Sequence, residues 1–140
     1  MPVAWTPDLT LGIPELDAQH LEMDRQLGLV RLVAEGRRRD LVEVLDGVRE
    51  CMSRHFVSEE ALMARAGDPT LVAHHARHRD FIERLAGFED RCDREGPSAR
   101  LAGEVQAWLG AWVREHQRFD LHVAAQARQA GLLETGRPPR

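Results

Sequence analysis

Histidine and carboxylate side chains recur along this chain at the spacing of about one helical turn. Three pairs are four residues apart: His55 and Glu59, His74 and His78, and His116 and Asp120. Residues four apart on an α-helix lie on the same face, so both members of a pair can approach one ion. Imidazole and carboxylate groups are ligands that transition metals accept. The spacing therefore indicates metal binding, provided that the pairs meet in space.

Glu59 gives the strongest of these signals because it lies in the middle of an apolar helix face. Apolar positions surround it at helical period between Leu41 and Met63. A buried carboxylate is costly unless it is paired or binds a metal. His20 also falls within an apolar stripe, and His74 lies on such a stripe, whereas the neighbouring His75 is rotated away by roughly 70°.

Four amphipathic helices are expected to position these side chains. The first helix is expected to run from Pro14 to Gly36 and the second from Asp40 to Gly67. The third is expected to run from Thr70 to the break at 96–98, and the fourth from Ser98 to Gly131. Helices of similar length joined by short loops favour an all-α, up-down-up-down four-helix bundle. Residues 1–13 are expected to form an extended N-terminal arm with Trp5 as its anchor. We expect 1–131 to form a single domain and 132–140 to be a disordered tail.

The predicted bundle brings the ligand pairs to one height. Measured from the end that holds the loops near 36–40 and 94–98, His55 is 15 residues from Asp40 and Asp120 is 22 residues from Ser98, and the others fall between these limits. At about 1.5 Å per residue this slab is only about 10 Å thick. Its members are His20, His55, Glu59, His74, His78, His116 and Asp120.

Seven such ligands are too many for a single zinc ion, which takes four. They suit a pair of redox-active transition metals, with imidazoles in terminal positions and the two carboxylates as bridges. Taken singly, each histidine could be a satisfied core residue and each pair a surface contact. Neither alternative predicts seven inward polar residues at one height. His75 and His122 fail the geometry and are assigned to the surface.

Composition excludes several other classes of function. The chain has 140 residues and a net charge of −4, which gives no basic surface for nucleic acid. No apolar run is long enough to span a membrane, and the N-terminus does not resemble a secretory signal. Cys51 and Cys92 are too few for a disulfide framework and are interpreted as reduced thiols. These features predict a cytoplasmic protein.

The motifs LGIPELDAQH, HFVSEE, HHARH and WVREHQRFD, taken in this order, resemble the hemerythrin family, specifically its single-domain bacterial members. The likeness covers residues 5–120. It implies a non-haem di-iron centre with an oxo or hydroxo bridge. By this resemblance, one iron is held by His74, His78 and His116. The other is held by His20 and His55, and the two irons are bridged by Glu59 and Asp120.

The resemblance implies reversible binding of O₂ at the iron that has only two histidines, for oxygen carriage, storage or sensing. Phe56, Trp112 and Val113 are expected to line a dry pocket there. Gln117 departs from the family, which usually has an aliphatic residue at this position; its amide could admit water, or it could lie at an interface. The alternatives are a di-iron redox enzyme acting on peroxide, nitric oxide or O₂, and an oxygen-responsive interaction module. A monomer is expected, with a redox or signalling partner left open.

Overall fold

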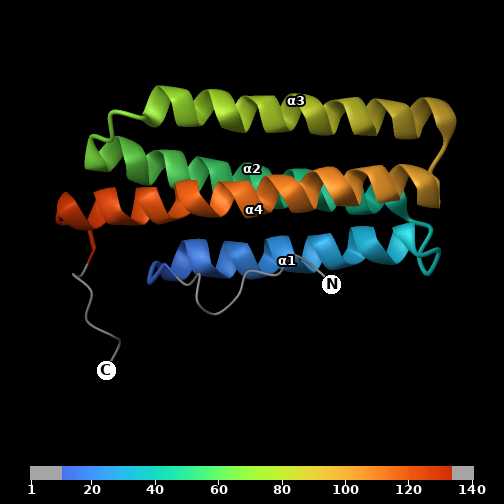
Figure 1. Cartoon of the computed structure of the whole chain (residues 1–140), viewed down its shortest axis with the longest axis horizontal. Coiled ribbons are helices and arrows are strands. Elements are labelled where there is room, and N and C mark those ends of the chain that lie inside the picture. Colours follow the sequence, from blue (N-terminus) through green and yellow to red (C-terminus); the bar gives the residue numbers. More distant parts are fainter. Residues whose placement is uncertain (1–10, 134–140) are drawn as a thin grey trace.

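Four helices build the part of the chain that the structure describes, residues 11–133 of a computed structural model (Figure 1). They are α1 (Pro14–Ala34), α2 (Leu41–Ala66), α3 (Leu71–Glu95) and α4 (Ala99–Gln129). The predicted all-α class and the four-helix bundle are confirmed. Most of the predicted arm, including Trp5, and most of the predicted tail lie outside the described residues. No helix within 11–133 is both long and apolar enough to cross a membrane.

The helix boundaries follow the local signals in the sequence. Pro14 occupies the first position of α1, where its missing N–H costs nothing. Gly67 ends α2 with φ of 65°, a left-handed conformation that disfavours residues with a Cβ. Ser98 caps α4, because its hydroxyl accepts a hydrogen bond of 3.1 Å from the Leu101 N–H. These three predictions are confirmed.

Two of the predicted caps have the right position but different chemistry. Asp40 precedes α2, yet its carboxylate makes no cap hydrogen bond and is bound by Arg38 instead. Thr70 precedes α3, and its side chain does not cap that helix either. Its backbone N–H and its hydroxyl both donate to Asp68 Oδ1, at 2.9 and 2.6 Å. Asp68 therefore organises the turn from α2 to α3, and it is buried, with 5% of its surface exposed.

Replacing Asp68 with alanine should lower the free energy of unfolding by about 2 kcal/mol, because two hydrogen bonds are lost at a buried helix start. Asp68 also lies 3.2 Å from His122 Nε2 on α4, so the change removes a link between two elements. Urea denaturation would measure this loss of stability. The slope of the unfolding free energy against urea concentration should be the same in the variant and the wild-type protein. Asp40→Ala is the matched control and should leave stability nearly unchanged. Equal effects of the two substitutions would contradict this account of the turn.

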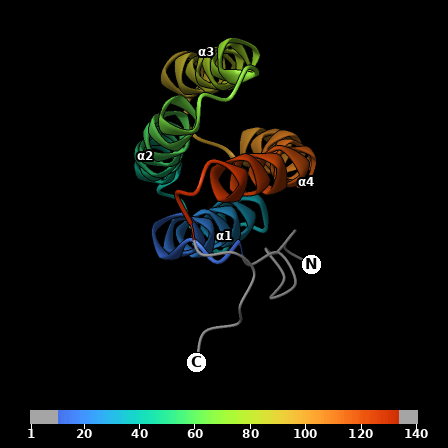
Figure 2. The ribbon, with the colours of Figure 1, turned by 90° about the vertical axis from the view of Figure 1, so that its left-hand side faces the viewer.

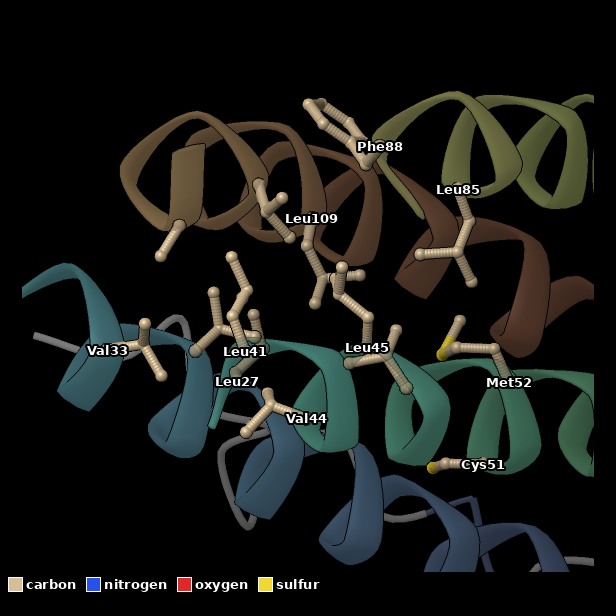
Figure 3. Close-up of a cluster of buried hydrophobic side chains, with 14 of the residues drawn as sticks. Leu27, Val33, Leu41, Val44, Leu45, Cys51, Met52, Leu85, Phe88 and Leu109 are labelled. Atoms are coloured by element: carbon tan, nitrogen blue, oxygen red, sulfur yellow. The ribbon is translucent and has the colours of Figure 1, made fainter. Parts of the chain in front are cut away.

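The bundle is not evenly packed around its axis. Helix α1 packs against α2 and α4, and α3 packs mainly on α2, with only a thin contact to α4 (Figure 2). A large apolar cluster fills the end near the α1–α2 and α3–α4 connections, and Val33, Leu41, Leu45 and Leu109 belong to it (Figure 3). A smaller cluster around Leu11, Ile13, Leu16 and Ala124 closes the other end.

Both cysteines are free thiols inside the bundle, as predicted. Cys51 is 7% exposed and Cys92 is 3% exposed. Burial, assisted by the negative charge of Glu22, raises the pKa of Cys51 to about 12. Because the thiolate is the reactive form, these cysteines behave as packing residues.

Candidate metal centre

The seven residues predicted as ligands converge in the middle of the bundle, between its two apolar clusters. Each of them is at most 3% exposed. They come from all four helices: His20 from α1, His55 and Glu59 from α2, His74 and His78 from α3, and His116 and Asp120 from α4. Burial of two carboxylates and five imidazoles at one place requires that they compensate one another or bind cations.

The first part of the centre gathers three imidazoles around one oxygen of Glu59. His78 Nε2 and His116 Nε2 each lie 3.1 Å from Glu59 Oε1, and His74 Nε2 contacts the same oxygen. The ligand atoms of these four residues all lie within 4.8 Å of one another, which is compact enough to hold one metal ion. Two of the imidazoles come from consecutive turns of α3, as their spacing predicts.

The second part lies on the opposite side of the same carboxylate. His55 Nε2 is 3.3 Å from Glu59 Oε2 and 3.2 Å from Asp120 Oδ1. His20 Nε2 lies 3.4 Å from Asp120 Oδ2. The residues His55, Glu59, His116 and Asp120 form a second group that could hold an ion. His20 borders this group, with its ring centroid 4.9 Å from that of His55.

Glu59 and Asp120 each present their two oxygens to different imidazoles, which is the arrangement that a bridging carboxylate needs. Glu59 Oε2 and Asp120 Oδ2 are buried and accept no hydrogen bond from any residue in 11–133. His116 Nε2 lies between the two groups, 3.1 Å from Glu59 and 3.4 Å from Asp120. The donor set therefore fits two adjacent cations of the transition-metal type.

Electrostatics in the metal-free protein favour ionised carboxylates. Burial opposes ionisation of Glu59, but contacts with Asp120 and with the surrounding imidazoles hold its pKa well below the usual value. Burial and the neighbouring Glu59 oppose ionisation of Asp120, yet His116 and His20 lower its pKa. Burial opposes protonation of His55, but Asp120 and Glu59 outweigh it and raise the pKa to about 9. A bound cation would replace such protons, so metal binding should release them.

Two polar residues outside the predicted set orient the imidazoles. Gln19 Oε1 lies 3.0 Å from His55 Nδ1, and Glu60 Oε2 lies 2.9 Å from His78 Nδ1. Each therefore accepts the Nδ1–H and leaves Nε2 to face the centre. The sequence analysis did not identify Gln19 or Glu60. Their one local signal is that Gln19 precedes His20 and Glu60 follows Glu59 in the sequence. This adjacency cannot show which imidazole on another helix each side chain contacts.

Gln19 is itself held in place: its Nε2 donates to Ser58 Oγ at 2.9 Å, and Ser58 Oγ donates to Glu15 Oε1 at 2.9 Å. Gln19→Leu should therefore weaken metal binding by about tenfold or more, because His55 loses the acceptor that fixes its orientation. Competition against a chelator of known affinity would measure this. Gln106→Leu, a half-buried glutamine of α4 that makes no hydrogen bond within 11–133, is the control. Equal affinities in both variants would reject the role of Gln19.

Arg77 distinguishes His116 from the other imidazoles. Its Nε donates to His116 Nδ1 at 3.4 Å, and its guanidinium lies over the rings of Phe119 and Trp112, at 4.2 and 5.1 Å. In this arrangement the His116 proton is on Nε2, which faces Glu59. Metal binding through Nε2 requires a proton on Nδ1, so Arg77 must then turn away from the ring.

Two of the aromatic side chains expected near the centre pack on its His78 and His116 side. Phe56 stacks on His78 with ring centroids 3.9 Å apart, and Trp112 stacks on His116 at 4.3 Å. Val113 is fully buried. Gln117 is half-buried and makes no hydrogen bond within the described range, so its amide makes no polar contact with the centre.

The histidines assigned to the surface are there. The His75 side chain is 60% exposed and pairs with Glu60. The His122 side chain is 40% exposed and pairs with Asp68. The contrast between His74, which is 3% exposed, and the adjacent His75 confirms the helix face that periodicity predicted.

Comparison with known proteins gives a consistent result. The family model described as Hemerythrin HHE cation binding domain matches residues 11–125. A bacteriohemerythrin of Stenotrophomonas maltophilia is 31% identical over 136 residues, which cover 96% of this chain and 87% of the relative. A bacteriohemerythrin of Pseudomonas paraeruginosa is 28% identical over 84% of this chain and 76% of the relative. No solved structure matches.

Proposed function

Because this chain belongs to the hemerythrin family, we propose that it binds O₂ reversibly at a pair of iron ions held in the buried centre. Its role would be oxygen carriage, storage or sensing. The observation that carries the proposal is the sharing of Glu59: one oxygen faces three imidazoles and the other faces His55.

The proposed division of ligands is unequal. His74, His78 and His116 would hold one iron, and His20 and His55 the other. Glu59 and Asp120 would bridge the two, together with an oxo or hydroxo group. The ion with two imidazoles would keep an open position, which is the requirement for binding a small molecule directly to a metal. A pair of ferrous ions held there would supply the two electrons that reversible O₂ binding requires.

The protein side chains would contribute orientation and exclusion of water. Gln19 and Glu60 hold imidazoles with Nε2 toward the centre. Phe56 and Trp112 cover His78 and His116 with flat apolar surfaces, and Val113 fills space beside them. Keeping water and protons from bound oxygen limits its loss as superoxide or peroxide. The histidine-rich ligand set supports reversible binding over turnover, because four-helix di-iron carboxylate enzymes use more glutamates and fewer histidines.

The test is a set of visible absorption spectra on protein loaded with iron under reducing, oxygen-free conditions. We expect two irons per chain and a visible band that appears when O₂ is admitted and vanishes when O₂ is removed. A reversible carrier consumes O₂ only in proportion to the protein. Sustained consumption of O₂, peroxide or nitric oxide would show a redox enzyme instead, and a spectrum insensitive to O₂ would refute both.

We further propose that residues 1–131 form one domain around this centre. The support is that α1 to α4 each contribute proposed ligands, so the complete set requires all four helices. A cytoplasmic location is also proposed, because Cys51 and Cys92 are free thiols.

A further inference from the structure

A groove of about 610 Å³ is lined by residues of α3 and α4, among them Arg84, Gly87, Phe88, Arg91, Ala107 and Trp108. These two helices make only a thin contact with each other (Figure 2).

 Gly87 and Ala107 leave the α3–α4 groove open, because neither carries a large side chain and nothing lies within 4 Å of a Cβ placed on Gly87. The rings of Phe88 and Trp108 form its apolar part, with centroids 5.2 Å apart.

A continuous series of ring contacts leads from this groove to the metal centre. Trp108 stacks on Phe81 with centroids 4.7 Å apart. Phe81 contacts Trp112 at 4.6 Å, and Trp112 stacks on His116 at 4.3 Å. Each spacing is at the short end of the range for aromatic pairs in contact. The half-buried Trp108 at the groove is thus joined to His116, a proposed ligand, through rings in van der Waals contact.

Such a series suits electron transfer. Electron tunnelling through protein slows steeply with distance and is fastest where atoms are in continuous van der Waals contact, so packed rings can couple the groove to the centre without being oxidised or reduced themselves.

We propose that the α3–α4 groove docks an anionic, planar aromatic electron donor of the reduced-flavin class, whose electrons reach the metal centre through Trp108, Phe81 and Trp112. The inference rests on the proposed function, because an O₂-binding di-iron centre that loses electrons to oxygen must be returned to the ferrous state. Reduced flavin loses two electrons and two protons and becomes oxidised flavin. Two ferric ions each gain one electron, and the protons pass to solvent.

Charge at the groove supports an anionic donor. Arg91 pairs with Glu104 and Arg94 pairs with Asp90. Arg84 pairs with no carboxylate within 11–133, and its guanidinium lies 5.6 Å from the centre of the Phe88 ring. One uncompensated cation therefore lies at the mouth of a groove whose accessible aromatic ring is the half-buried Trp108. This combination matches a flat ring system that carries a phosphate.

Docking is tested on the metal-free protein with flavin mononucleotide, whose fluorescence is quenched when its ring stacks on tryptophan. We expect saturable quenching by the wild-type protein. Arg84→Glu should weaken binding by about tenfold or more, because it places a carboxylate beside the phosphate. Arg65→Glu makes the same charge change on an exposed position of α2 and should have no effect. Absence of saturable quenching would overturn the proposal.

The route is tested on iron-loaded, ferric protein at saturating reduced flavin. Phe81→Leu removes the middle ring without altering the lining of the groove. This variant should bind flavin and two irons per chain as the wild-type protein does. The rate at which flavin reduces the ferric ions should fall by about tenfold. Reduction of this variant at the wild-type rate would overturn the route. Failure of the wild-type chain to take up iron would refute the proposed function instead, since flavin docking is measured without metal.

Discussion

Loading the metal-free protein with ferrous ions should raise its melting temperature by about ten degrees. The reason is that the folded chain holds seven potential ligands together, whereas the unfolded chain does not. A ligand present at about a thousand times its dissociation constant stabilises the folded state by about 4 kcal/mol. For a chain of this size each kcal/mol corresponds to roughly 3 °C. The buried carboxylates add to the effect, because a cation satisfies oxygens that accept no hydrogen bond.

Thermal unfolding followed by circular dichroism, with and without iron under oxygen-free conditions, measures this shift. Magnesium is the appropriate control because it prefers oxygen ligands and keeps its water, so a histidine-rich centre should bind it poorly. A chelator added to the loaded protein should return the melting temperature to the metal-free value. Equal shifts with iron and magnesium would show non-specific binding to the acidic surface.

Replacing Glu59 with glutamine should remove both metal ions, because this one carboxylate faces both halves of the centre. The amide has nearly the same volume, so the fold should persist, but it lacks the charge and the second anionic oxygen. We expect binding to weaken by at least about a hundredfold, equivalent to roughly 3 kcal/mol. His20→Ala should have a smaller effect, with one metal retained per chain, because His20 lies beside Asp120 and His55 at the second group.

Metal content after anaerobic loading and desalting would distinguish these variants. His75→Ala is the matched control, since His75 is adjacent to a proposed ligand in the sequence but its own side chain is 60% exposed. It should retain two ions. If Glu59→Gln also retained two ions, the bridging arrangement would be wrong, even if the centre binds metal.

The sequence by itself was sufficient for the four helices and for the height of the centre. Helical period is a local property, so the spacing of His55 and Glu59 places both on one face whatever surrounds them. The same reasoning separated His74 from His75 before any packing was known. Proline, glycine and serine signals at Pro14, Gly67 and Ser98 act through neighbouring backbone groups, which is why these boundaries are confirmed.

Contacts between helices could not be derived in this way. The spacing cannot show that Glu59 turns one oxygen toward His74 and the other toward His55, because these imidazoles are on different helices. It also could not give the chemistry at the start of α3: Thr70 is at the N-cap position, but its side chain does not cap the helix, and the buried Asp68 accepts hydrogen bonds from its N–H and hydroxyl.

Tertiary structure also decided the surroundings of the centre. Gln19 and Glu60 carry no distinctive spacing, yet they accept hydrogen bonds from imidazoles 36 and 18 residues away. The thin contact between α3 and α4, and with it the groove beside Trp108, likewise depends on how α3 packs on α2. Periodicity fixes the direction of a side chain relative to its own helix axis. Only the packing of one helix against another fixes the atoms that it meets.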